Sequence, residues 1–479
     1  MNAPASADHL DRRVFADYLT RTRWFAGKGR PFEVTDIRVL GEVPGRVEDS
    51  PHVLIHLVEV GYGDVGGEKE LYQVPLAFYE HPQGRLDHAF IGWWEDPALG
   101  WVHAYDAVHD RESMACWLRS FDAAAAAPVA SDGPLAFHRV SGHQLDTSAH
   151  SALFAGEQSN SSVAFGEDAL MKVFRKVTPG VNPDIEIHEV LTAAGSDHVA
   201  ALYGWVEATA DPARAGDEPV MQLAMLQQFL RTATDGWDLA LASVRSLLGS
   251  PELHATDSGG DFAYESTRLG EAVAEVHRQL AESFPSEKRG PEAATALARA
   301  MNDRLDRALD AVPDLAEHAE RLRILFARVG GLGGLEVQRI HGDLHLGQTL
   351  RTSKGWKIVD FEGEPAKPLA ERTLPDSPWR DVAGMLRSFD YAPRSVEHSQ
   401  PSGESDPELA DLRRLRANEW ANRNRNYFLV AYGGDLTAEQ RILLDAYIAD
   451  KAVYETVYEA RNRPGWLSIP LEALAQIGG

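Results

Sequence analysis

The first part of the chain alternates apolar and polar residues in a way that predicts a β-rich unit. A short amphipathic stretch, Leu10–Leu19, predicts a helix. Three strand-like runs separated by Gly and Pro follow it, at Val34–Leu40, His52–Val60 and Glu70–Tyr79. We place the end of this β-rich unit near residue 110.

A second set of strands precedes a helical remainder. The Ala-, Pro- and Gly-rich stretch 120–134 predicts a helix end followed by a linker or loop. Strands are predicted over Ala152–Gly166 and Ala169–Val177, and the pattern becomes helical from Gly236 onward, with one hairpin inside Val337–Pro365. The chain is therefore predicted to be α+β. Its expected parts are a cap (1–110), a β-rich small lobe (111–228) and a mostly helical lobe (229–479).

Composition and charge narrow the classes of function. The 479 residues are 44% hydrophobic, which is enough for a core and excludes wholesale disorder. The net charge of −25 repels phosphate backbones and anionic lipids, so we expect neither nucleic acid nor membrane as a partner. A single cysteine, Cys116, forms no internal disulfide, and no apolar run approaches the roughly 20 residues of a membrane span. We expect a soluble, cytoplasmic protein that binds a small molecule.

The strongest chemical signal is the sequence HGDLHLGQ at 341–348, followed by IVDFE at 358–362. Phosphoryl transfer requires mainly positioned groups and balanced charge. One carboxylate must accept the proton of the attacking hydroxyl, and Asp343 suits this role. An amide oxygen and a second carboxylate suit Mg²⁺. We therefore assign Gln348 and Asp360 to the metal, with Glu362 as the candidate for a second ion.

A phosphoryl-transfer enzyme also needs a cation for the nucleotide phosphates, and Lys172 lies in an alternating strand where it would serve. It needs a carboxylate to hold it in place. The segment that follows predicts a helix with Asn182 as N-cap and Pro183 in its first turn. Of the carboxylates there, we favour Glu186 over Glu189 as the partner of Lys172.

Two further segments are candidates for nucleotide binding. A small polar turn at 156–162 joins two strands, and such a turn can present N–H groups and hydroxyls to phosphates, although a plain hairpin turn is equally compatible. Its candidate residues are Gln158, Ser159, Asn160 and Ser161. The stretch Ala224–Trp237 is the expected linker to the helical lobe, where Gln227 and Gln228 are candidates for adenine binding or simply face solvent.

These motifs resemble those of the actinobacterial maltokinases, within the aminoglycoside-phosphotransferase-like kinases. The matching segments are RWFAGKGRP, GEQSNSSVAFG, MKVFRKVTPGVNPDIEIHE, HGDLHLGQTLRT, DFEGEPAKPLAERTLPDSPWRDVAGMLRSFDY and DKAVYETVYEARNRPGWLSIP. The resemblance implies a bilobal protein-kinase-like fold with an N-terminal cap. It also implies ATP and Mg²⁺ as cofactors, maltose 1-phosphate as the product for α-glucan (glycogen) synthesis, and a maltose-supplying enzyme as a candidate partner.

The resemblance also bears on the roles of a helix face near the C-terminus and of two residues around the catalytic loop. Lys451, Tyr454 and Tyr458 fall at i, i+3 and i+7, on one helix face, where tyrosines stack on sugar rings and an ammonium binds hydroxyls. Core packing is the alternative. In similar kinases the residue that corresponds to Asp381 braces the catalytic loop, and we expect His341 to fix the same loop rather than to move protons.

Other functions remain open from the sequence. Some relatives of this architecture phosphorylate glucosamine, and aminoglycosides are a further acceptor class. A cationic acceptor requires carboxylates, which residues near Asp390 and Asp411 would supply. A nucleotide-binding pseudokinase scaffold is an alternative of another class. The intact set of Lys172, Asp343 and Asp360 argues against the scaffold.

Overall fold

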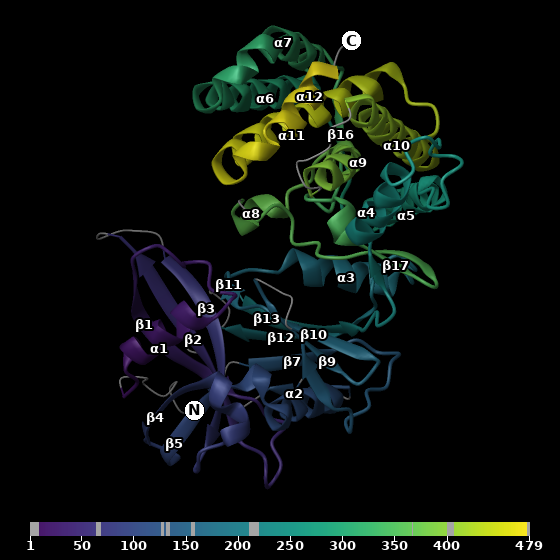
Figure 1. Cartoon of the computed structure of the whole chain (residues 1–479). Helices are drawn as coiled ribbons and strands as arrows, with labels where there is room; N and C mark the ends of the chain where they lie inside the picture. Colours follow the sequence, from purple (N-terminus) through teal and green to yellow (C-terminus); the bar gives the residue numbers. More distant parts are fainter. Residues whose placement is uncertain are drawn as a thin grey trace. The chain divides into compact units, whose positions relative to one another are not determined.

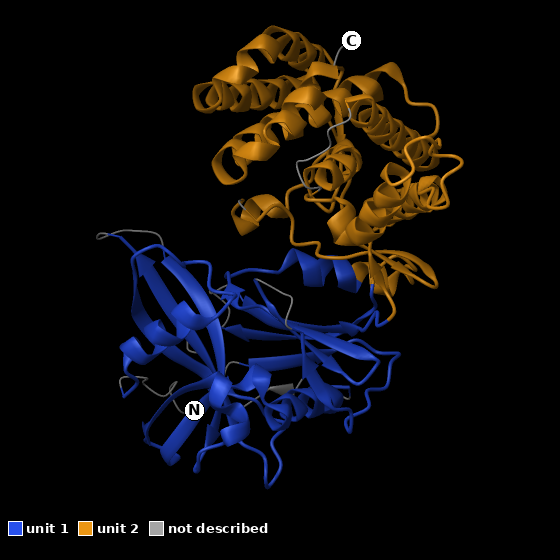
Figure 2. Ribbon diagram, in the orientation of Figure 1, with its two compact units in different colours: residues 1–189, 200–231 blue, residues 190–199, 232–479 orange. Residues whose placement is uncertain are grey.

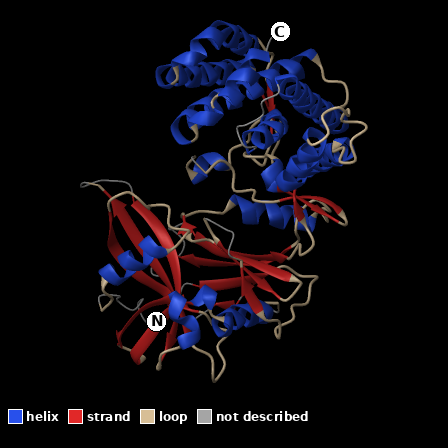
Figure 3. Cartoon of the chain, in the orientation of Figure 1, coloured by secondary structure: helices blue, strands red, loops and turns tan. Residues whose placement is uncertain are grey.

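The computed structural model describes residues 9–63, 69–125, 129–130, 135–154, 159–209, 220–365, 367–399 and 407–476. The chain folds into two compact units (Figure 2). One comprises residues 1–189 and 200–231, and the other 190–199 and 232–479. Strands dominate the first and helices the second, which confirms the α+β prediction (Figure 3).

Up to residue 231 the elements in chain order are α1 (Arg12–Arg21), β1 (Phe32–Glu42), β2 (His52–Tyr62), β3 (Lys69–Tyr79), η1 (Gly84–Ala89), β4 (Phe90–Asp96), β5 (Gly100–Asp106), η2 (Ala107–His109), α2 (Arg111–Ala123), β6 (Val129–Ala130), β7 (Leu135–Arg139), β8 (Ser151–Leu153), β9 (Ser161–Phe165), β10 (Ala169–Val173), β11 (Lys176–Val177), α3 (Pro183–Ala193), β12 (Leu202–Thr209) and β13 (Val220–Gln228) (Figure 1). From residue 232 they are β14 (Thr234–Asp235), α4 (Gly236–Leu248), α5 (Ala263–Ser283), β15 (Glu287–Arg289), α6 (Pro291–Ala311), η4 (Pro313–Leu315), α7 (Ala316–Gly330), β16 (Leu335–Val337), η5 (Leu346–Gln348), β17 (Thr349–Thr352), β18 (Gly355–Ile358), α8 (Leu369–Arg372), α9 (Trp379–Ser399), α10 (Pro407–Gly433), α11 (Ala438–Asn462), η6 (Pro464–Trp466) and α12 (Ser468–Gln476).

The first sheet is antiparallel, with strand order β1-β2-β3-β5-β4 and β11 added beside β3. The three strands predicted from alternation are confirmed as β1, β2 and β3. The predicted N-terminal helix is α1, and Asp11 caps it by accepting a hydrogen bond from the Arg13 N–H at 2.9 Å. Phe15 and Leu19 of α1 are fully buried in the core over this sheet.

The second sheet contains seven antiparallel strands in the order β6-β7-β12-β13-β10-β9-β8. The strand that carries Lys172, β10, is flanked by β9 and β13 and is therefore internal. Its side chains alternate between the two faces of the sheet. The sheet thus holds Lys172 on a rigid element.

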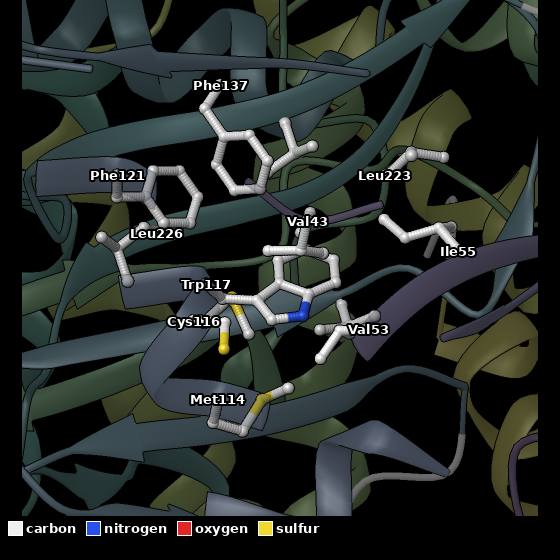
Figure 4. Packing of buried hydrophobic residues seen from close by; sticks show 14 of the residues in the cluster. Val43, Val53, Ile55, Met114, Cys116, Trp117, Phe121, Phe137, Leu223 and Leu226 are labelled. Carbon is white, nitrogen blue, oxygen red and sulfur yellow. The ribbon is translucent and has the colours of Figure 1, made fainter. Parts of the chain in front are cut away.

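The cap has a core of its own over the first sheet, and it shares a second hydrophobic core with the small lobe. Figure 4 shows Ile55 of the first sheet, Trp117 of α2 and Phe137 of the second sheet packed in the same cluster, all with almost no exposed surface. Gln73 of β3 adds polar links, because its Nε2 donates to the carbonyls of Phe174 and Leu223 at 2.9 and 2.8 Å. The expected boundary near residue 110 thus divides a single packed unit.

The second unit contains helices and two small sheets, β14-β17-β18 and β15-β16. The helical pattern predicted from Gly236 is confirmed, since α4 begins there with Asp235 as its N-cap. The predicted hairpin is β17–β18. A Cβ on Gly236 would lie 2.1 Å from Thr349 Oγ1, so only glycine allows the start of α4 to approach this hairpin.

Helix α11 packs against α9, α6 and α7, and it carries the lysine and tyrosines predicted to bind sugar. Its buried side includes Leu444, Tyr447 and Ala452. Among the helices that the structure describes, none has the length and apolar character that crossing a bilayer requires.

Candidate active site

Asp381, in the first turn of α9, holds the loop that contains Asp343. Its carboxylate accepts hydrogen bonds from the backbone N–H groups of His341 and Gly342, at 2.7 and 2.8 Å, and contacts His277 Nε2 at 3.1 Å. Burial raises the pKa of Asp381, but the hydrogen bond and charge of His277 outweigh it and lower this pKa below the usual range. These contacts match the expected role of Asp381 as a brace.

His341 fixes the same loop from within. Its Nδ1 accepts the N–H of Asp343 at 3.3 Å, and its Nε2 lies 2.9 Å from the carbonyl of Val359, to which it donates. Both ring nitrogens are therefore engaged with backbone groups. This arrangement supports the expectation that His341 positions the loop, and it ties Asp343 to the residue that precedes Asp360.

Asp343 forms an ion pair with Lys451 of α11, with 3.2 Å between Oδ1 and Nζ. Burial lowers the pKa of Lys451, but Asp343 and Glu455 outweigh it and raise this pKa above its ordinary value. The lysine is therefore cationic at neutral pH. The sequence assigned Lys451 to the sugar, and the structure places its ammonium directly on the predicted catalytic carboxylate.

The ion pair lines a pocket of about 810 Å³ within the second unit, together with Tyr454, Tyr458 and Trp466. The rings of Tyr454 and Tyr458 are stacked with their centroids 6.5 Å apart, and 42% and 44% of these residues' surface is exposed. Their exposure argues against core packing. The pocket is large enough for a two-ring ligand.

Most acidic groups near this pocket are already neutralised. Arg387, only 1% exposed, binds Glu455 Oε2 through Nε and Nη2 at 2.9 and 2.7 Å, and binds Asp390 through Nη1 at 2.9 Å. Burial raises the pKa of Glu455, and Arg387 opposes this rise. Arg425 also binds Asp390, at 3.0 Å. Asp390 therefore carries little uncompensated charge for a cationic acceptor.

The expected metal ligands lie at the ends of the β17–β18 hairpin. Gln348 ends η5, and its carbonyl accepts the N–H of Val359 at 3.1 Å, which brings it beside Asp360. The side-chain Oε1 of Gln348 is buried and has no hydrogen-bond partner among the described residues. A buried oxygen left without a donor suits a cation, so these residues fit Mg²⁺. Glu362, two residues after Asp360, is half-buried.

Asp360 has a strained backbone. Its φ of 60° makes it the only non-glycine residue with a positive φ in the part of the chain that the structure describes. Such a conformation persists only where the surroundings hold it, and it is concentrated at functional sites. The exposed carboxylate of Asp360 is thereby presented by a turn that the sequence would not otherwise favour.

In the first unit, Lys172 is buried and its Nζ lies 3.0 Å from Asp184 Oδ2. Burial raises the pKa of Asp184, but Lys172 and His188 outweigh it and hold this pKa well below its usual range. Asn182 caps α3 as predicted, by accepting the Asp184 N–H at 2.9 Å. Asp184, which the sequence analysis did not consider, is therefore one carboxylate partner of Lys172. The preference for Glu186 over Glu189 stays a prediction.

The predicted phosphate turn is only partly described. Gln158 lies outside the described residues, and Ser159 is exposed and Asn160 half-buried. Ser161 is buried, and its Oγ accepts a hydrogen bond from Arg175 Nε at 2.8 Å. The hydroxyl of Ser161 thus makes a structural contact with Arg175, and its contact with phosphate stays a prediction.

The adenine candidates end strand β13. Gln227 is half-buried, and its Oε1 is buried without a hydrogen-bond partner among the described residues. The N–H groups of Gln228 and Phe229 donate to the carbonyls of Ala201 and Asp168, at 2.8 and 2.7 Å. These two N–H groups are therefore not free to bind adenine. The side chain of Gln227 remains a candidate for adenine binding.

Sequence reasoning missed one buried ion pair in the first unit, between Arg175 Nη2 and Asp106 Oδ2 at 2.7 Å. Both side chains are fully buried, Tyr18 donates its hydroxyl hydrogen bond to the same carboxylate, and Trp24 lies 4.7 Å from the guanidinium. Asp106 ends strand β5 of the cap, and Arg175 lies two residues after the end of β10, the strand that carries Lys172. They lie 69 positions apart in the sequence, so no local pattern indicates this pair.

Two models of known protein families match parts of this chain. A maltokinase N-terminal cap domain matches residues 18–110, and a phosphotransferase enzyme family matches residues 153–417. A glucosamine kinase of Streptacidiphilus jiangxiensis is 29% identical over 335 residues, covering 66% of this chain and 70% of that protein. One of Mycolicibacterium smegmatis (strain ATCC 700084 / mc(2)155) is 26% identical over 339 residues, covering 66% and 77%.

Solved structures show the same fold. A glucosamine kinase in complex with glucosamine, ADP and inorganic phosphate aligns with a TM-score of 0.66 at 22% identity, over 97% of this chain and 99% of that one. Another, glucosamine kinase (crystal form B), gives 0.69 at 22% identity over 99% of both chains. The expected kinase-like fold with its cap is confirmed. Because the phosphotransferase match alone spans more than half of the sequence, the chain belongs to the phosphotransferase enzyme family and carries a maltokinase N-terminal cap domain before it.

Proposed function

We propose that this enzyme is an ATP-dependent sugar kinase that phosphorylates maltose at its anomeric hydroxyl, giving maltose 1-phosphate. The observation that carries the proposal is the Asp343–Lys451 ion pair, which lines the same pocket as the stacked Tyr454 and Tyr458. A pair of aromatic rings suits an acceptor with two sugar rings. The product would feed α-glucan synthesis, with a maltose-supplying enzyme as partner.

The second unit supplies the groups for the acceptor. Asp343 orients the anomeric hydroxyl and accepts its proton as the oxygen bonds to the γ-phosphorus. The bond from that phosphorus to the β–γ bridging oxygen breaks, and ADP leaves. Lys451 holds the Asp343 carboxylate in place through their ion pair and puts a positive charge beside the reacting oxygens. Gln348 and Asp360 would hold Mg²⁺, with Glu362 for a second ion, and the metal neutralises phosphate charge when bound.

The first unit supplies groups for the nucleotide. Lys172, held by Asp184, neutralises charge on the α- and β-phosphates. Glu186 remains a candidate to support this lysine from the same helix turn. Ser159 and Asn160 are the described residues proposed for the phosphate turn. Gln227 is the stronger of the two adenine candidates because its Oε1 lacks a hydrogen-bond partner among the described residues.

Glucosamine is the second candidate acceptor, because both curated relatives named above are glucosamine kinases. Within the pocket, Asp238 is exposed and forms no ion pair among the described residues, so it would suit an ammonium group. Of the other carboxylates that line the pocket, Glu455, Glu459 and Glu364 are engaged with arginines. Asp235 caps α4 by accepting the N–H groups of Trp237 and Asp238. This balance favours a neutral sugar.

A coupled ATP-consumption assay with Mg²⁺ tests the proposal, with maltose, glucose, glucosamine and kanamycin compared in parallel. Selective turnover of maltose supports it, and D238N should then leave the kcat/KM for maltose unchanged. Selective turnover of glucosamine that D238N abolishes would establish the second candidate. No turnover of any acceptor, combined with tight nucleotide binding, would instead support the pseudokinase scaffold.

A further inference from the structure

The cap displays two tryptophans on its surface. Trp93 on β4 is 63% exposed and Trp101 on β5 is 56% exposed, and no other tryptophan is more than half exposed in the described ranges. Their ring centroids lie 5.0 Å apart and their planes are tilted by 34°. An exposed aromatic pair of this kind needs an explanation, because the fold itself gains little from it.

The strand register places this pair on one face of the hairpin. Trp93 lies opposite His103, and Glu95 lies opposite Trp101, so the four side chains share a face and the tryptophans are diagonal neighbours. We call these four residues the outer patch. It combines two apolar rings with one carboxylate and one imidazole.

The outer patch is rigidly supported from behind. Trp94, on the opposite face, packs edge-on against Phe78 at 5.8 Å within the cap core. The turn of the hairpin is closed by Asp96, which accepts the N–H groups of Ala98 and Leu99 at 2.8 and 3.0 Å. A preformed surface loses little conformational entropy when it binds a ligand.

Area and charge decide which kind of ligand fits. A tryptophan side chain offers at most about 250 Å², so the pair exposes roughly 300 Å², far below the ~800 Å² per partner of a stable protein interface. The net charge of −25 and Glu95 itself disfavour anionic ligands. A neutral sugar chain fits both limits, because its apolar ring faces stack on indoles while its hydroxyls bond to carboxylate and imidazole.

We propose that the outer patch binds an α-linked glucan chain, with one glucose ring on each indole. Successive rings of an α-1,4-linked glucan are turned relative to each other, so the chain curves, and the tilt between Trp93 and Trp101 suits such a curve. A β-1,4-linked glucan forms a flat ribbon and suits parallel, coplanar rings. This binding site goes beyond the kinase reaction and does not depend on which sugar the enzyme phosphorylates.

Calorimetric titration of the full-length protein with maltoheptaose tests the proposal. The W93A/W101A variant should bind at least about tenfold more weakly, which corresponds to about 1.4 kcal/mol. Y264A is the matched control, since Tyr264 is 73% exposed on α5, outside the pocket of Asp343, and should leave binding unchanged. Cellohexaose should bind the parent protein more weakly than maltoheptaose does.

Three results would overturn the proposal. If maltoheptaose binds the W93A/W101A variant as tightly as it binds the parent protein, the glucan occupies another site. If the parent protein binds cellohexaose as tightly as maltoheptaose, the argument from the curvature of the chain fails. Self-association in sedimentation that W93A/W101A abolishes, without glucan binding, identifies a second copy as the occupant. Turnover of maltose is measured separately on each variant. A lack of turnover with intact glucan binding would therefore count against the proposed kinase function alone.

Discussion

Lys451 on α11 and Asp343 in the catalytic loop form an ion pair, although they lie 108 positions apart in the sequence. Lys451 is the only side chain that donates to the Asp343 carboxylate among the described residues. Helix α11 therefore contacts Asp343 directly, while Asp381 of α9 and the carbonyl of Val359 hold the loop through His341 and Gly342. A lysine that serves a general base in this way affects the chemical step more than the binding of the sugar.

We expect K451M to lower kcat by about 100-fold, with little change in the KM for ATP, because the variant leaves Asp343 without its cation. D343N should abolish turnover and leave ATP binding intact. Steady-state kinetics and nucleotide titration measure both effects. K354M, at an exposed lysine of the hairpin turn, is the control. A K451M enzyme with parental kcat but a raised KM for sugar would return Lys451 to a purely sugar-binding role.

The stacked tyrosines should control acceptor binding. We expect Y454A and Y458A each to raise the KM for the sugar about tenfold, because each removes one stacking surface from the pocket. The KM for ATP should stay within about twofold. Y427A, at a half-buried tyrosine of α10 that does not line the pocket, provides the comparison. An unchanged KM in both pocket variants would show that the rings only pack against neighbouring helices.

The metal ligands predict a specific Mg²⁺ dependence. Q348A should increase the Mg²⁺ concentration for half-maximal activity by roughly tenfold, and D360A should abolish activity. The stabilisation by Mg²⁺ in the presence of ADP, measured by thermal unfolding, should shrink in parallel. Q476A alters an exposed glutamine in α12 and should behave like the parent. A normal Mg²⁺ response in Q348A contradicts the assignment.

The buried ion pair between Arg175 and Asp106 should be essential for stability. D106A leaves a fully buried guanidinium without its carboxylate, and we expect a loss of about 3–5 kcal/mol in the free energy of unfolding. The double variant D106A/R175M should recover part of the loss. D36A, which breaks the exposed pair with Arg38, should cost no more than about 0.5 kcal/mol. Urea unfolding distinguishes these values.

His56, in the cap core, predicts the response to acid. Burial lowers its pKa from 6.5 to about 4, so the unfolded chain binds a proton over this range while the folded chain does not. The free energy of unfolding should therefore fall by about 3 kcal/mol as the pH decreases from above 6.5 to 4. H56F should flatten this part of the profile, and H81F, at an exposed histidine, should not. Equal slopes in H56F and the parent would refute this origin.

Local sequence patterns predicted the elements but not the contacts between distant segments. Alternation identified β1, β2 and β3, and the N-cap residue Asn182 identified the start of α3. The motif spacing also predicted the loop of Asp343 and the hairpin that leads to Asp360. These features depend on residues close in sequence, where periodicity and capping act directly.

The contacts that the sequence did not predict are those that depend on tertiary packing. Three carboxylates follow Lys172 on one helix, and the orientation of α3 on its sheet brings Asp184 into an ion pair with this lysine. The pairing of Lys451 with Asp343 depends on how α11 packs beside α9. Neither orientation can be read from sequence spacing. The sequence therefore indicated the types of residue at the site, but neither the contact of Asp184 with Lys172 nor that of Lys451 with Asp343.

Gln73 limits how freely the cap of this enzyme can be exchanged for another. Its amide donates hydrogen bonds to the carbonyls of Phe174, just after the lysine strand β10, and of Leu223 on the neighbouring strand β13. A chimera with the cap of another kinase must therefore contain equivalents of Gln73 and Asp106. Without them, the carbonyls of Phe174 and Leu223 and the guanidinium of Arg175 would be buried without these partners. Exchanging caps would alter the setting of Lys172 before it altered any contact with sugar.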